Sequence, residues 1–87
     1  MSAMGKHAKL LIKIVSAEAD AGIPFADLRQ LLLRLGFSER IRGSHHIFKR
    51  VDIPERLNLQ RQGRHAKRYQ VRDIRDIINR YGLDREI

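Results

Sequence analysis

Apolar residues recur at helical spacing in three segments of the chain. In the first, from Lys6 to about Asp20, four apolar side chains fall on one face and three lysines on another, which predicts an amphipathic helix. A second helix is expected between Pro24 and Gly36, because proline suits a helix start and glycine a helix end. A third is expected from Gln70 to Tyr81, before a further glycine. The chain is therefore expected to contain at least three helices.

Between the second and third helices the apolar pattern changes to a period of two. Residues 37–43 alternate in this way and predict a strand. The Gly43-Ser44 pair can form a tight turn into His45–Arg50, whose Ile and Phe suit a second, antiparallel strand. These two segments predict a β-hairpin.

A short third strand is expected at Leu57–Gln60, after a loop at Asp52–Glu55 that contains proline. Residues 61–68 are expected to form a basic connection to the last helix. Because the strands are grouped between helices, the order favours an α+β fold, with a small three-stranded antiparallel sheet and helices packed on one face.

Length and composition limit the functions that the chain can perform. It has 87 residues, no cysteine and a formal net charge of +8, so we expect one domain without disulfides, thiolate nucleophiles or a large buried cavity. Residues 39–75 hold 11 Lys and Arg against 4 Asp and Glu, a net charge of +7. This concentration favours an anionic partner. With no membrane-spanning apolar stretch and no signal-peptide pattern, we expect a soluble, cytoplasmic protein with no membrane partner.

Two adjacent histidines are the candidate catalytic residues. His45 and His46 follow the Gly43-Ser44 turn inside the most basic part of the chain. Histidine can act as a general acid or base near neutral pH, which RNA cleavage through the 2′-hydroxyl requires. Strand alternation places the two rings on opposite faces of the sheet. Only one is therefore expected to be catalytic, while the other can hydrogen-bond in or beside the core.

The other candidate site residues are basic or polar and lie near the histidines or in the basic connection. A metal site is disfavoured, because adjacent histidines on opposite strand faces match no common ligand spacing, and no cofactor is expected. The alternative interpretation is that the basic side chains form an ordinary solvated surface and bind no RNA. The expected RNA-binding residues are Arg42, Ser44, Lys49, Arg61, Arg64, Lys67, Arg68 and Arg72.

Several motifs together resemble the HicA family of bacterial toxins. They are Leu35-Gly36-Phe37 and residues 40–48, which read Arg-Ile-Arg-Gly-Ser-His-His-Ile-Phe. Three further segments resemble longer HicA-like variants with an extra N-terminal helix, namely residues 25–28, Asn58-Leu59-Gln60 and residues 66–71. On this resemblance residues 1–87 form one HicA-like domain, with an N-terminal helical extension at 1–22 and a core at 23–82.

The resemblance implies a fold like that of a double-stranded-RNA-binding domain. It also implies the toxin component of a type II toxin–antitoxin system, a metal-independent messenger-RNA interferase that a HicB-like antitoxin neutralises. The family's catalytic histidine follows the Gly-Ser turn and corresponds to His45, while members with this residue one place later leave His46 open. The competing hypothesis is a non-catalytic nucleic-acid-binding module of the same fold.

Overall fold

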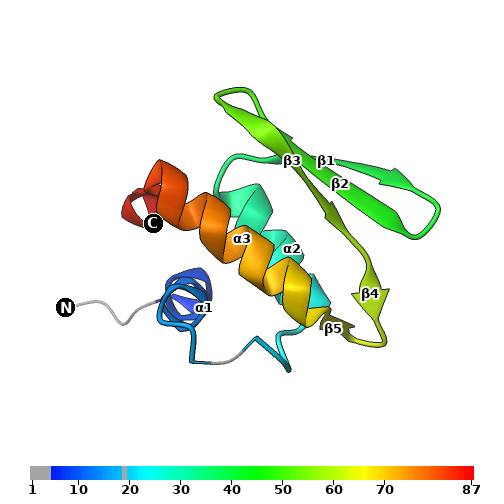
Figure 1. Cartoon of the computed structure of the whole chain (residues 1–87), viewed down its shortest axis with the longest axis horizontal. Coiled ribbons are helices and arrows are strands. Elements are labelled where there is room, and N and C mark those ends of the chain that lie inside the picture. The colour runs from blue at the N-terminus through cyan, green and yellow to red at the C-terminus, as the bar shows by residue number, and fades with distance from the viewer. Residues whose placement is uncertain (1–4, 19) are drawn as a thin grey trace.

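The computed structural model describes residues 5–18 and 20–87 and has an α+β fold (Figure 1). Residues 1–4 and residue 19 of the expected extension at 1–22 lie outside the described residues. The elements follow in the order α1 (Lys6–Val15), α2 (Phe25–Arg34), β1 (Ser38–Arg42), β2 (His45–Arg50), β3 (Ile53–Leu59), β4 (Arg61–Gln62), β5 (His65–Ala66), α3 (Arg68–Tyr81) and a final 3₁₀ turn, η1 (Leu83–Glu86). The expected fold class is confirmed.

The main sheet has three antiparallel strands in the order β1-β2-β3, with β2 in the centre. The β1–β2 hairpin closes through Gly43 and Ser44, and Gly43 has the positive φ of 57° that a two-residue hairpin turn requires. Both α2 and α3 lie on the same side of this sheet (Figure 1). Its other face is left open to solvent, as expected.

One hydrophobic core joins all three helices to the covered face of the sheet. Phe48 of β2 and its cross-strand neighbour Leu57 on β3 are buried against the helices. On the other side, Leu11 and Ile14 of α1 belong to the same cluster. The apolar stripe expected on α2 is buried as well. Because α1 contributes to this core, it packs as part of the domain.

The first helix ends earlier than its apolar pattern predicted. It stops at Val15, five residues before Asp20, and Ala17 has a positive φ of 58°. No large apolar side chain follows Val15 before Ile23, so a longer helix would bury little further apolar surface. Arg75 of α3 donates a hydrogen bond of 2.6 Å to the carbonyl of Ile14, which also accepts from the Ala17 N–H over 3.1 Å, and so ties the end of α1 to α3.

The third strand begins four residues before its expected start. It runs from Ile53 and includes Pro54, so the predicted loop at Asp52–Glu55 is wrong except at its first residue. Proline is tolerated because β3 is an edge strand, where one side of the backbone has no neighbouring strand to bond. The strand also ends at Leu59, one residue earlier than predicted.

The basic connection folds into a small hairpin of its own. β4 and β5 pair antiparallel, with Arg61 opposite Ala66. The hairpin is tied to the start of α2, because the Phe25 N–H donates to the Arg64 carbonyl and the Ala66 N–H to the Ile23 carbonyl, each over 2.9 Å. The chain then enters α3 at Arg68, two residues before the predicted start.

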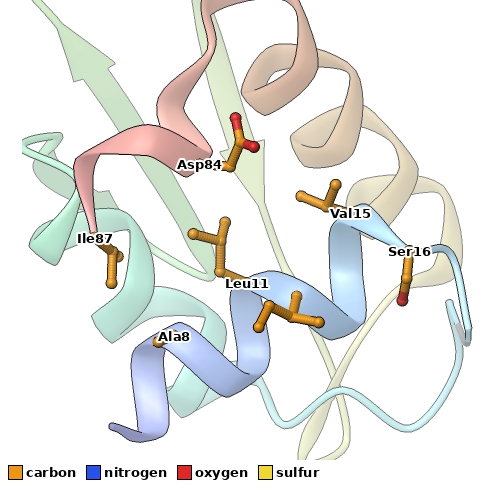
Figure 2. Close-up of a pocket in the computed structure, with 7 residues that line it drawn as sticks. Ala8, Leu11, Val15, Ser16, Asp84 and Ile87 are labelled. Carbon is orange, nitrogen blue, oxygen red and sulfur yellow. The ribbon is translucent and has the colours of Figure 1, made fainter. Parts of the chain in front are cut away.

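An apolar hollow of about 410 Å³ lies between α1 and the C-terminal end of the chain (Figure 2). Leu11 and Val15 line one side, while Asp84 and Ile87 line the other (Figure 2). None of its lining residues is a histidine or a cation. Among the described helices, none has the length and apolar character that crossing a membrane would take.

Candidate active site and nucleic-acid interface

The two histidines of β2 lie on opposite faces of the sheet, as strand alternation predicted. His46 pairs with Leu59, whose side chain is buried, and faces the helices. His45 pairs with Arg42 across the hairpin and faces the open side. The two imidazoles therefore have different surroundings, which decide what each can do.

His45 is exposed and held by a hydrogen bond from β3. Its Nδ1 lies 3.1 Å from Oδ1 of Asn58. An amide oxygen can only accept, so the neutral imidazole carries its proton on Nδ1 and donates it to Asn58. The lone pair of Nε2 is then free to accept a proton from a ligand. This geometry suits a general base.

A shallow hollow of about 320 Å³ adjoins His45, between β3 and the first turns of α3. It brings together a base, a cation, three amides, an aromatic ring and a carboxylate. The lining residues are His45, Arg56, Asn58, Gln60, Tyr69, Gln70 and Asp73.

His46 joins the sheet to the helices. Its Nδ1 lies 2.7 Å from Oε2 of Glu39, and its ring meets the Phe25 ring edge to face, with centroids 4.9 Å apart. Only 14% of the His46 side chain and 8% of the Glu39 side chain are exposed. Arg29 donates to both oxygens of Glu39, over 2.8 and 2.7 Å. These contacts favour a structural role for His46.

The pKa of Glu39 reflects this network. Hydrogen bonds from Arg29 are the main cause that holds the pKa of Glu39 below its ordinary value, and the bond with His46 lowers it further. Burial acts in the opposite direction but is outweighed. Glu39 is therefore a carboxylate at neutral pH, as its bonds to two basic side chains require.

Ser44 and Lys67, two of the expected RNA-binding residues, are brought together near His45. Gln60 connects them, because its amide nitrogen donates to the Ser44 hydroxyl over 3.0 Å and its amide oxygen accepts from Lys67 over 3.4 Å. Lys67 immediately precedes α3, and Ser44 forms the β1–β2 turn. A hydroxyl and an ammonium group thus lie at the same end of the sheet as His45.

Four cations surround Ile47 on the open face of the sheet. Arg42 and Lys49 are among the expected RNA-binding residues, whereas Arg40 and Arg56 were not predicted. None of these four side chains forms an ion pair with a carboxylate of the residues that the structure describes. We call Arg40, Arg42, Lys49 and Arg56 the sheet-face cations. Their charge is available to a phosphate backbone.

The remaining expected RNA-binding residues point to other surfaces. Arg61 lies over the Phe25 ring, 4.9 Å from its centroid, and Arg64 is exposed at the turn of the small hairpin. Arg68 and Arg72 line a different hollow with Asp20, whose carboxylate is 3.9 Å from Arg72. The expected RNA-binding residues are thus divided among several surfaces, of which the sheet face is next to His45.

Within residues 5–18 and 20–87, no three His, Asp or Glu side chains gather in a way that could hold a metal ion. No family model, no curated protein and no solved structure matches the chain.

Proposed function

We propose that the protein is an RNA-cleaving toxin in which His45 is the general base. The observation that carries the proposal is the exposed imidazole whose Nδ1 is bonded to Asn58, beside four sheet-face cations. The resemblance of residues 40–48 to the HicA family supports the same reading. On that resemblance the protein acts on messenger RNA in the cytoplasm and is neutralised by a HicB-like antitoxin.

The proposed reaction is attack of a ribose 2′-oxygen on the adjacent phosphorus. Nε2 of His45 accepts the 2′-hydroxyl proton as the new oxygen–phosphorus bond forms. The bond from phosphorus to the 5′ oxygen breaks, and this leaving oxygen takes a proton from water, to which the shallow hollow is open. The products are a 2′,3′-cyclic phosphate and a 5′-hydroxyl, and no metal or cofactor is needed.

The cations stabilise the charge that develops on phosphorus. Arg56 lines the hollow with His45 and also belongs to the sheet-face cations. It can therefore contact the reacting phosphate, while Arg40 and Arg42 contact neighbouring phosphates. Ser44 and Lys67 can bind the RNA strand beside the β1–β2 turn.

The decisive experiment measures cleavage of a labelled single-stranded RNA and of its 2′-deoxy analogue. Wild-type protein is expected to cleave only the RNA and to leave cyclic phosphate ends. His45→Ala should lower the rate by about 10² to 10⁴, the usual contribution of a general base. His65→Ala, which removes an exposed imidazole from the small hairpin, is the matched control and should retain wild-type cleavage.

Two results would contradict the proposal. Wild-type protein that binds RNA and cleaves none of it would instead support a non-catalytic nucleic-acid-binding module, for which the sheet-face cations suffice. Cleavage that survives in His45→Ala would move the general base elsewhere.

A further inference from the structure

Tyr69 and Asp73 line the hollow beside His45, and the proposed proton transfer uses neither of them. We propose that they form a subsite for one unpaired guanine of a single-stranded RNA, with Tyr69 stacking on the base and Asp73 reading its edge. This inference rests on the proposed function, because it places the guanine next to the phosphate at His45.

Tyr69 presents a large aromatic surface to solvent at the site. It stands in the first turn of α3, and 51% of it is exposed. Aromatic side chains beside a cationic surface commonly stack on nucleic-acid bases, at roughly 1 to 3 kcal/mol per base. A base that stacks on Tyr69 must be unpaired, so this side chain selects single-stranded RNA.

Asp73 lies one helical turn after Tyr69, on the same side of α3. Its side chain is exposed and forms no ion pair among the described residues, in a protein with a net charge of +8. A carboxylate next to RNA phosphates is unfavourable unless it binds a hydrogen-bond donor. An ionised carboxylate can only accept, through two oxygens. Guanine is the base that presents two adjacent N–H donors on its Watson–Crick edge, and it therefore fits best.

The first turn of α3 is fixed relative to His45. Gln70 is only 2% exposed, and its amide nitrogen donates a hydrogen bond of 3.3 Å to the backbone carbonyl of Asn58. This bond fastens the start of α3 to β3, at the residue whose side chain holds His45. Tyr69 and His45 are thus both positioned by contacts with β3. A base-binding subsite needs such a fixed position relative to the reacting phosphate.

The test uses an uncleavable ligand, so that binding is measured apart from cleavage. Fluorescein-labelled 2′-O-methyl heptamers carry either one central guanine or one central inosine, which lacks the exocyclic amino group. Fluorescence anisotropy is expected to show roughly five- to tenfold tighter binding of the guanine heptamer by the wild-type protein, the effect of one charge-assisted hydrogen bond. Tyr69→Ala should weaken binding of both heptamers by at least about fivefold.

The variant that tests base reading is Asp73→Asn, which keeps the shape of the side chain and removes its charge. It should bind the two heptamers equally. Asp76→Asn is the matched control, because Asp76 lies on the same helix but lines a different hollow, and it should keep the preference for guanine. Circular dichroism confirms that each variant is folded.

The outcomes separate this inference from the proposed function. Equal binding of the two heptamers by the wild-type protein, or a guanine preference that survives in Asp73→Asn, overturns the subsite even if His45 cleaves RNA. A guanine preference lost in Asp73→Asn alone supports the subsite, even if the protein proves to be a binding module without cleavage.

Discussion

His45 and His46 are adjacent in β2, yet Asn58 holds the first on the open face while Glu39 holds the second between the sheet and the helices. The exposed ring is bonded to a neutral amide at 3.1 Å, and the covered ring to a carboxylate at 2.7 Å. The same type of side chain therefore has two different surroundings within one dipeptide.

His46→Ala is expected to destabilise the fold, whereas His45→Ala should not. The first change removes the partner of Glu39 and the edge-to-face contact with Phe25. Loss of a hydrogen bond to a charged group costs about 1.5 to 3 kcal/mol, which lowers the melting temperature of a domain of this size by several degrees. Thermal melts of both variants and of the wild type measure the effect. A melting temperature of His46→Ala equal to that of the wild type would refute the structural role.

Stability is expected to fall in acid partly through Glu39. Because Arg29 holds the pKa of Glu39 below its ordinary value of 4.5, the unfolded chain takes up this proton at a higher pH than the folded protein does. The contribution of Glu39 to the stability of the fold is therefore fully present at a pH above its ordinary pKa. It is lost as the pH falls through the lowered pKa of the folded protein. In melts from pH 7 to pH 3, the difference between wild type and Glu39→Gln should shrink below about pH 4.5. A difference that stays constant over this range would contradict the assignment.

The sheet-face cations are expected to dominate the salt dependence of RNA binding. Each phosphate contact that is lost should reduce the slope of log K against log salt by about 0.7 for a single strand. Arg40→Gln with Arg42→Gln should therefore flatten the slope more than Arg61→Gln with Arg64→Gln, since Arg61 is engaged over Phe25. Anisotropy titrations at several salt concentrations test this order. The reverse order would place the phosphates on the small hairpin.

Asn58→Ala is expected to slow cleavage with little effect on stability, because Asn58 is exposed and acts through His45. Without its acceptor, the ring is free to rotate and to carry its proton on either nitrogen. Misplacement of a catalytic group costs up to about 10² in rate. The loss should appear in kcat, while KM changes little. Wild-type kcat in this variant would show that Asn58 does not position the base.

Much of the fold could be predicted, because the spacing of apolar residues within each segment indicates whether it forms a helix or a strand. The apolar period placed α2 and α3, and alternation placed β1 and β2 with the two histidines on opposite faces. The start of β3 was missed because Pro54 normally interrupts strands, and only the position of β3 at the sheet edge makes it acceptable. That position is a property of the assembled sheet and cannot be read from the residues of β3.

The candidate site was predicted only in part, for a similar reason. His45 was identified from its turn and its neighbours, but Asn58 and Arg56 come from β3, and Asp73 from α3. Arg56 was missed because the strand was expected to start at Leu57. Had the predicted strand begun one residue earlier, it would have included Arg56 on the same face as Asn58. Arg68 and Arg72 were expected to bind RNA with the other cations, but they lie apart from His45 in a hollow with Asp20.

The spacing between His45 and Phe48 gives a rule for comparing this protein with other sequences. Phe48 is fully buried, so every residue of β2 at an odd distance from it faces the open side. A histidine three positions before the buried aromatic faces the open side of the sheet, and one two positions before it faces the helices. An insertion or deletion of one residue within this interval would exchange the two surroundings, so alignments of related chains should be anchored on the aromatic rather than on the histidine pair.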